Sequence, residues 1–132
     1  MLGQFQQSSL RIEVDAPQNE IAASLTHGAQ VKAWLFPQQF EGLPEQLKVG
    51  DRFTSQLALI SVTHTVEVCT ENSLRLILSG SIDGFHEWSW GDGWVQSRLE
   101  GVSLLPLNLG ATLSLWRLRQ QLESATVETT DD

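Results

Sequence analysis

The stretch that most constrains the fold of this chain is a long amphipathic segment near its C-terminus, residues 106–123. Apolar residues recur there at spacings of three and four, which is the period of one side of an α-helix. They are Leu109, Ala111, Leu113, Leu115, Trp116, Leu118 and Leu122. The residues left for water are Arg117, Arg119, Gln120 and Glu123. The pattern predicts one long helix with a broad apolar side, which another layer of structure must cover.

Most of the preceding chain alternates apolar and polar residues, a period of two that predicts β-strands. Strands are predicted at residues 10–14, 52–59, 62–68, 74–78, 85–90 and 94–105. Two short helices are predicted after the first strand, one from Pro17 towards Gly28 and one from Val31 to Phe36. Turns joining the later strands are predicted at residues 71–73, 81–84 (with the hairpin dipeptide Asp83-Gly84) and 91–93.

This order predicts an α+β fold in which a six-stranded antiparallel sheet curls around the C-terminal helix, with two short helices after strand 1. A chain of 132 residues with 41% hydrophobic residues suits one core, and a single domain is predicted over residues 9–123. Residues 1–8 are predicted to be a loose lead-in, and residues 124–132 a frayed acidic tail.

The side-chain register of the last strand stays open. A three-residue loop at 91–93 would place Trp90 and Trp94 on the same face of the sheet. Val95 and Leu99 nevertheless look like the buried residues of that strand. Either a bulge lies near Gly93 or one of the two tryptophans points outward.

Charge and cysteine content exclude several classes of function. Sixteen acidic residues outnumber eight basic ones, which gives a net charge of −8 and no basic stripe for nucleic acid or anionic lipid. No apolar run approaches the length of a membrane span, and the N-terminus, MLGQFQQSSL, lacks the pattern of a signal peptide. The single cysteine, Cys69, cannot form an internal disulfide. We therefore expect a soluble cytoplasmic protein, without membrane insertion or nucleic-acid partner.

Several short motifs, taken in order, resemble the START-like or SRPBCC superfamily. Residues 16–26, APQNEIAASLT, resemble its opening, and residues 31–37, VKAWLFP, resemble the Trp-and-Pro segment that follows. Residues 47–53, LKVGDRF, are similar to its strand entry, and residues 85–88, FHEW, together with the final helix stand where this superfamily has theirs. The most similar branches are the polyketide cyclase/dehydrase-like and heat-shock-activator-like ones.

The resemblance implies a helix-grip fold with a cavity between the sheet and the long helix. Members of the superfamily bind lipids, steroids, polyketides or other apolar molecules there, and some act on them. The chain departs from the pattern at Trp94-Val95-Gln96, where many relatives carry Gly-Thr, so tryptophans could narrow or fill the cavity. No catalytic residue of the superfamily transfers to this chain.

The candidate ligand-binding residues are apolar, aromatic or histidine side chains of the strands and helices. They are Trp34, Phe53, Leu57, His64, Val66, Leu76, His86, Trp88, Trp90 and Trp116. Each tryptophan also fits ordinary core packing, and His64 also fits a hydrogen-bonded core histidine. If a cavity is present, His64 and His86 would supply its polar contacts or an acid–base group.

No catalytic constellation, metal site or cofactor is predicted. Cys69 ends a strand with outward parity and has no partner motif, which favours a structural role. The histidines and the cysteine lack the CxxC or HExxH spacing of metal ligands. Gly91-Asp92-Gly93 lacks the third glycine and the helix of a phosphate-binding loop.

Three functions remain open from sequence. The first is a carrier or sensor, monomeric or weakly dimeric, that holds a small hydrophobic molecule. The second is a cyclase- or dehydratase-like enzyme that uses a cavity histidine. The third is a protein-interaction module that has no ligand pocket.

Overall fold

The computed structural model describes residues 3–103 and 106–130, and it describes residues 124–130 as backbone. Its strands are β1 (Gln4–Glu13), β2 (Gln39–Glu41), β3 (Arg52–Leu57), β4 (Ile60–Cys69), β5 (Ser73–Gly80), β6 (Ile82–Gly91) and β7 (Trp94–Ser103). Its helices are α1 (Gln18–Thr26), α2 (Gly28–Trp34) and α3 (Leu107–Thr130). The predictions for residues 1–2, 104–105 and 131–132 lie outside the described residues.

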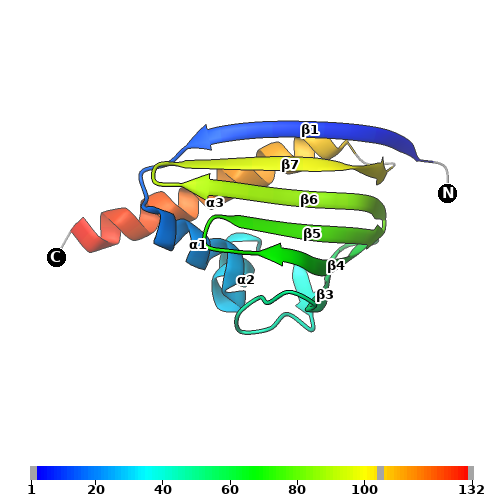
Figure 1. Ribbon diagram of the computed structural model, residues 1–132, viewed down its shortest axis with the longest axis horizontal. Helices are drawn as coiled ribbons and strands as arrows, with labels where there is room; N and C mark the ends of the chain where they lie inside the picture. Colours follow the sequence, from blue (N-terminus) through cyan, green and yellow to red (C-terminus); the bar gives the residue numbers. More distant parts are fainter. Residues whose placement is uncertain (1–2, 104–105, 131–132) are drawn as a thin grey trace.

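The strands form one antiparallel sheet in the order β1-β7-β6-β5-β4-β3-β2. The sheet curls, and α3 runs across its concave face with α1 and α2 packed beside it (Figure 1). The predicted α+β architecture is confirmed, but the prediction of six strands is wrong because the described chain has seven. The additional strand, β2, is three residues long and pairs with β3 inside a predicted loop. Three residues are too few for an alternating pattern to stand out.

Two predicted boundaries are wrong at the ends of the domain. Strand β1 begins at Gln4, so residues 4–8 pair with β7 and are not a loose lead-in. Helix α3 continues to Thr130, so residues 124–130 are helical and not a frayed tail. Backbone hydrogen bonds hold β1 in place along its whole length, so its polar Gln and Ser side chains do not prevent pairing.

The pairing of β5 with β6 ends at Leu78 and Gly84, so the connection overlaps the turn predicted at 81–84. Asp83-Gly84 nevertheless belongs to β6 and pairs with β7, so this dipeptide is not the centre of a tight hairpin. Gly84 pairs with Gly101 of β7. A Cβ atom at Gly84 would overlap the carbonyl oxygen of Glu100, and one at Gly101 would lie 2.6 Å from the carbonyl oxygen of Asp83. The two glycines therefore permit a close approach of β6 and β7.

The β6–β7 turn resolves the ambiguity of the two tryptophans. Gly91 pairs with Trp94 and Trp90 pairs with Val95, so the turn has two residues and Gly93 takes a φ of 82°. Trp90 and Val95 face the core, where they are 1% and 0% exposed. Trp94 points outward, and the Arg11 guanidinium carbon lies 4.4 Å from its ring centroid.

A bulge in β4 changes the side-chain parity at the end of this strand. The register shifts between Val66 and Val68, so Cys69 pairs with Leu74, a core residue. The predicted outward parity of Cys69 is therefore wrong, because one extra residue moves every later side chain to the other face. Strand β3 ends at Leu57, two residues before the predicted end at residue 59, because the chain turns at Ala58 and Leu59, and Leu59 is 99% exposed.

Helix α3 buries one of its two apolar stripes. The buried stripe consists of Leu107, Ala111, Leu115, Leu118 and Leu122, each at most 3% exposed. The prediction that Leu109, Leu113 and Trp116 also face the sheet is wrong, since they are 56%, 51% and 57% exposed. The buried stripe continues for two turns beyond Trp116, whereas the other stripe ends at Arg119 and Gln120. Burying the longer stripe removes more apolar surface from water.

The orientation of α3 can be tested with two truncations. We expect Leu118→Ala to lower the free energy of unfolding by about 2–5 kcal/mol, because it leaves a cavity in a fully buried contact. Trp116→Ala should change it by less than about 1 kcal/mol, although it removes more atoms. Urea denaturation followed by circular dichroism measures both values. A larger loss for Trp116→Ala than for Leu118→Ala would contradict the orientation.

Candidate functional site

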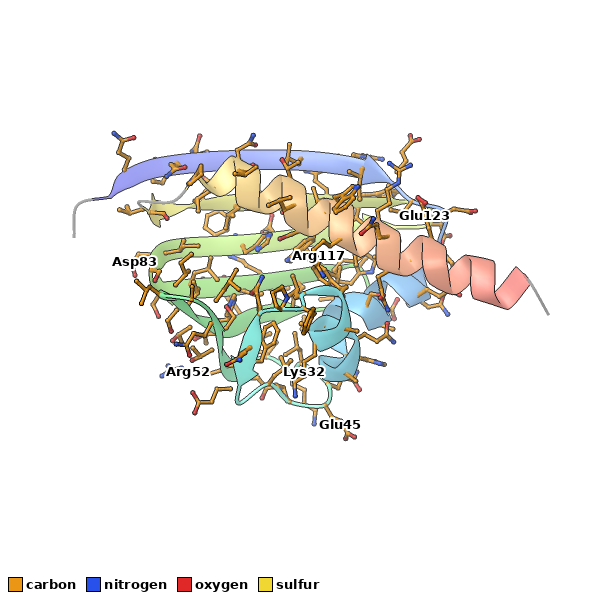
Figure 2. The ribbon with its side chains drawn as sticks, turned by 180° about the vertical axis from the view of Figure 1, so that it is seen from behind. Lys32, Glu45, Arg52, Asp83, Arg117 and Glu123 are labelled. Carbon is orange, nitrogen blue, oxygen red and sulfur yellow. The ribbon has the colours of Figure 1, made fainter. Side chains whose placement is uncertain are left out.

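A cavity of about 360 Å³ lies between the N-terminal half of α3 and the concave face of the sheet. On α3 its wall includes Gly110, Ala111 and Ser114, whose small side chains leave room beneath the helix. The sheet contributes apolar residues, among them Val62 and Leu99. Figure 2 shows α3 crossing the strands above this region. The cavity is therefore a consequence of small residues on one part of the helix.

A second hollow of about 120 Å³ adjoins the cavity, because the two share several lining residues, including Ser55, His64, His86 and Ser114. It reaches between the sheet and α2, where Trp34 and Trp88 pack edge to face with ring centroids 6.2 Å apart. The two neighbouring hollows together make up the candidate site.

The two histidines of the site come from strands on either side of β5. His64 on β4 pairs with Leu78, and His86 on β6 pairs with Leu76. Both side chains therefore project from the same face of the sheet, and both line the cavity.

Each histidine is held by an aromatic ring and a serine. The His64 ring stacks on Phe53 with centroids 4.6 Å apart, and its Nε2 atom lies 2.9 Å from Ser55 Oγ. The His86 ring lies against Trp88 with centroids 4.5 Å apart, and its Nε2 atom lies 2.7 Å from Ser97 Oγ. These contacts fix both rings before any ligand arrives.

Burial keeps both histidines uncharged near neutral pH. Desolvation lowers the pKa of His64 to about 4. Desolvation, and then the proximity of His64, lower the pKa of His86 to about 3. Removing an imidazolium from water disfavours its charged form, which is the physical cause of both shifts.

One polar atom of the site lacks a hydrogen-bond partner. His64 Nδ1 is buried and bonds to no atom among the described residues. Buried polar atoms are normally paired, and a single unpaired one costs about 1–3 kcal/mol. His64 Nδ1 is therefore a destabilising feature of the described structure, located beside the cavity.

The structure brings most of the predicted site residues together. Those that line the cavity or the adjoining hollow are Trp34, Phe53, Leu57, His64, Leu76, His86 and Trp88. Val66 and Trp90 are buried in the core instead, each 1% exposed. Trp116 lies on the exposed side of α3 and is removed from the candidates.

Sequence reasoning missed several lining residues, including Ser55, Ser114 and Arg117. Ser55 shares the inward parity of Phe53, and a polar residue at such a position is a signal for a cavity or a buried hydrogen bond. Ser114 and Arg117 lie beside the buried stripe of α3, at spacings of four and seven from Gly110. That row of small and polar residues was the signal for the open side of the helix.

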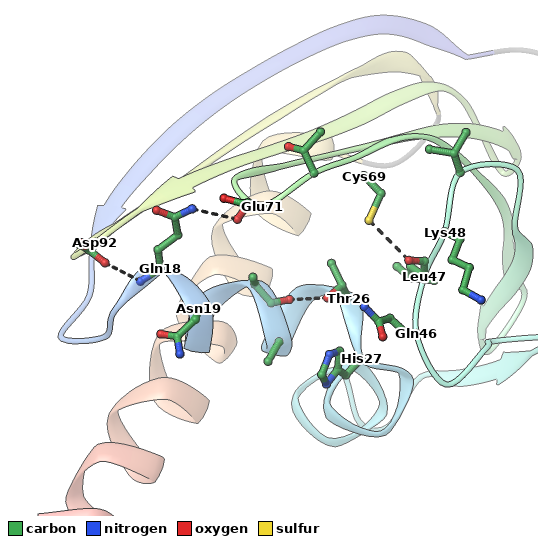
Figure 3. A pocket seen from close by; sticks show the side chains of 14 residues that line it. Gln18, Asn19, Thr26, His27, Gln46, Leu47, Lys48, Cys69, Glu71 and Asp92 are labelled. Atoms are coloured by element: carbon green, nitrogen blue, oxygen red, sulfur yellow. Dashed lines mark hydrogen bonds between the residues drawn. The ribbon is translucent and has the colours of Figure 1, made fainter.

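A separate groove of about 890 Å³ lies between α1 and the segment 46–49 (Figure 3). Some of its polar groups bond to each other: Gln18 N donates to Asp92 Oδ1 at 2.7 Å, and Cys69 Sγ donates to the Leu47 carbonyl at 3.5 Å. Burial and the nearby Asp51 carboxylate raise the pKa of the Cys69 thiol, which disfavours a reactive thiolate. The groove is larger than the cavity, but among the described residues it presents no buried polar group that still needs a partner.

Within residues 3–103 and 106–130, no cluster of three or more His, Cys, Asp or Glu side chains could hold a metal ion. Across the same described residues, no helix combines the length and the apolar character needed to span a membrane.

The lowered pKa values predict a pH-dependent stability. An unfolded histidine titrates near 6.5, so between that pH and about 4 the unfolded chain binds protons that folded His64 and His86 do not. The free energy of unfolding should therefore fall as pH decreases from 6.5 to 5, by up to about 1.4 kcal/mol per pH unit for each histidine. Urea denaturation at several pH values measures this slope.

The matched variant is His64→Gln/His86→Gln, which keeps polar side chains and removes both titrations. It should show a flatter slope between pH 6.5 and 5, a range above the usual titration of carboxylates. Equal slopes for the variant and the original protein would contradict the assigned pKa shifts.

Similar proteins were found by three-dimensional structure and not by sequence. No protein-family model matches the chain, and no curated protein does. DynU16, a protein of the dynemicin biosynthetic locus, superposes with a TM-score of 0.69 at 15% identity, over 90% of this chain and 48% of DynU16. This chain thus spans about half the length of DynU16.

Two similar structures match over nearly their whole length. The Aha1 dimer from Colwellia psychrerythraea superposes with a TM-score of 0.69 at 15% identity, over 89% of this chain and 96% of that one. A norcoclaurine synthase mutant of Thalictrum, in complex with a transition-state analogue, gives 0.70 at 8% identity, over 96% and 99%. Identities this low establish a common fold and no common activity. The architecture that the resemblance implied is thereby confirmed in three dimensions: the chain shares the fold of these structures, a curled antiparallel sheet with a long C-terminal helix across it.

Proposed function

We propose that the protein binds a small apolar molecule in the cavity between α3 and the sheet. The observation that carries this proposal is a cavity with apolar walls whose lining includes two buried, uncharged histidines, His64 and His86. Ligand pockets typically have volumes of about 300–1,000 Å³, apolar walls and a few placed polar groups. The cavity, at about 360 Å³, has these properties.

The polar groups of the cavity are few and rigidly held, which favours a mostly apolar ligand. Stacking on Phe53 and the contact with Ser55 hold the His64 ring still, so little side-chain freedom is lost on binding.

Non-covalent binding is favoured over a reaction in which a histidine acts as the general base. A general base works best when its pKa lies near the operating pH. The pKa values of about 4 and 3 make His64 and His86 weak bases at neutral pH. Their Nε2 partners are the hydroxyl groups of Ser55 and Ser97 rather than carboxylates, which would stabilise an imidazolium.

A protein-interaction module without a ligand is the weaker alternative, because it would leave the observed cavity without a role. The outer face of the sheet carries ion pairs that occupy its charged groups. Arg75 contacts Glu67 at 2.9 Å and Glu87 at 3.0 Å, and Arg98 contacts Glu100 at 2.7 Å. The dimeric state of Aha1 belongs to that protein.

The proposal can be tested with N-phenyl-1-naphthylamine, a neutral apolar dye that fluoresces when it leaves water. We expect saturable binding with one site per chain. Ser114→Phe should weaken binding at least about tenfold, because the added ring extends from α3 into both hollows. Fluorescence titration measures the dissociation constants.

Thr112→Phe is the matched control, since it adds the same ring on the exposed side of α3. It should leave the dissociation constant unchanged within about twofold. Circular dichroism and thermal unfolding of both variants verify that they are folded. Absence of saturable dye binding, or equal loss in the two variants, would contradict the proposal.

A further inference from the structure

Arg117 stands out among the residues that line the cavity. Of the described lining residues, it alone carries a permanent charge. The side chain is half-buried and belongs to the part of α3 that crosses the sheet (Figure 2). An arginine at the wall of an otherwise uncharged hollow needs a partner for its guanidinium group.

The charge of Arg117 is not matched within the described residues. Arg75, Arg98 and Arg119 each contact a glutamate carboxylate at 3.0 Å or less. No described carboxylate lies within ion-pair distance of Arg117, in a chain with sixteen acidic residues and eight basic ones. The other cations without an ion pair among the described residues are Arg11, Lys32, Lys48 and Arg52. Only Arg117 lines the cavity, so it is the cation there that can meet another anion.

The guanidinium group is nevertheless held in place. Arg117 Nε donates to the carbonyl oxygen of Trp34 at 2.8 Å, which ties α3 to the end of α2. This bond uses one of the five N–H donors and leaves those of the two terminal nitrogens for a ligand. A positioned fork of donors matches the two oxygens of a carboxylate.

The polarity of the cavity fixes the direction in which such a ligand would lie. The deep part holds neutral histidines and apolar walls, where a buried anion would lose its hydration without compensation. At Arg117 an anion meets a cation and keeps partial contact with water. Nearby Phe36 and Leu113, which are 68% and 51% exposed, mark the open rim of the cavity.

We infer that the ligand is an apolar carboxylic acid, bound with its carboxylate on Arg117 at the rim and its apolar body inside the cavity. This inference rests on the proposed function and adds the charge and the orientation of the molecule. It assigns Arg117, which the alternating sequence pattern left for water, as the residue that selects acids over neutral analogues.

The test compares decanoate with decan-1-ol, which has the same ten-carbon chain and no charge. Each displaces N-phenyl-1-naphthylamine from the protein at pH 8 in low salt. We expect Arg117→Gln to raise the dissociation constant of decanoate by about tenfold or more, because a charge-assisted contact is lost. The dissociation constant of decan-1-ol should stay within about twofold of its original value. Raising the salt concentration should weaken decanoate binding alone.

Two further variants separate charge from structure. Arg117→Lys keeps the cation and should retain most of the preference for decanoate. Arg119→Gln, which breaks an exposed pair with Glu123 on the same helix, should change neither affinity. Equal effects of Arg117→Gln on both ligands would show that Arg117 acts through its bond to Trp34, and would overturn the inference.

The outcomes distinguish this inference from the proposed function. If dye and decan-1-ol bind but the affinity for decanoate does not depend on Arg117, the proposed apolar site is supported and the inference of a carboxylic acid ligand is rejected. Failure of dye, alcohol and acid to bind would reject both.

Discussion

The docking of α3 on the concave face of the sheet is the interaction on which the rest of the structure depends. The C-terminal part of its buried stripe, Leu115, Leu118 and Leu122, is almost fully shielded from water. Towards the N-terminus, Gly110 and Ser114 lack the bulk to fill the space beneath the helix, and the cavity opens there. One helix therefore closes the core at one end and roofs the cavity at the other. Side chains of β1 hold the beginning of the helix through hydrogen bonds.

Keeping a hollow in a small domain has a cost that the surrounding residues reduce. Voids forfeit dispersion contacts, and unpaired polar atoms forfeit hydrogen bonds. Here the two cavity histidines are paired at Nε2 with serine hydroxyls and rest on aromatic rings, so the cost falls mainly on His64 Nδ1. These contacts hold the histidine rings in place around the hollow. The inner part of its described lining is uncharged, and the one positive charge, on Arg117, lies at the rim.

Features that depend on side-chain periodicity could be predicted from the sequence, whereas features that depend on the backbone could not. The alternation that placed His64 and Leu76 inward held, because each strand buries one face. Strand β2 and the first half of β1 were missed because main-chain pairing leaves no signature in polar side chains. The bulge after Val66 reversed the expected side of Cys69, since an inserted residue is silent in composition. On α3 two neighbouring apolar stripes were equally visible, and only the longer one is buried. Arg117 was assigned to water because a charged residue at the edge of an apolar stripe usually faces solvent.

The fold alone does not decide the function, since the similar structures include a synthase mutant bound to a transition-state analogue and a dimer named Aha1. The chemistry of this cavity is more discriminating. Its histidines are neutral and weakly basic, and the one permanent cation among its described lining residues lies at the rim. Such a site can orient a molecule without transforming it. An occupant would also add contacts under the loosely supported half of α3, so binding and helix docking are thermodynamically linked. Occupancy would then stabilise the helix over its cavity, which is the behaviour expected of a carrier or sensor.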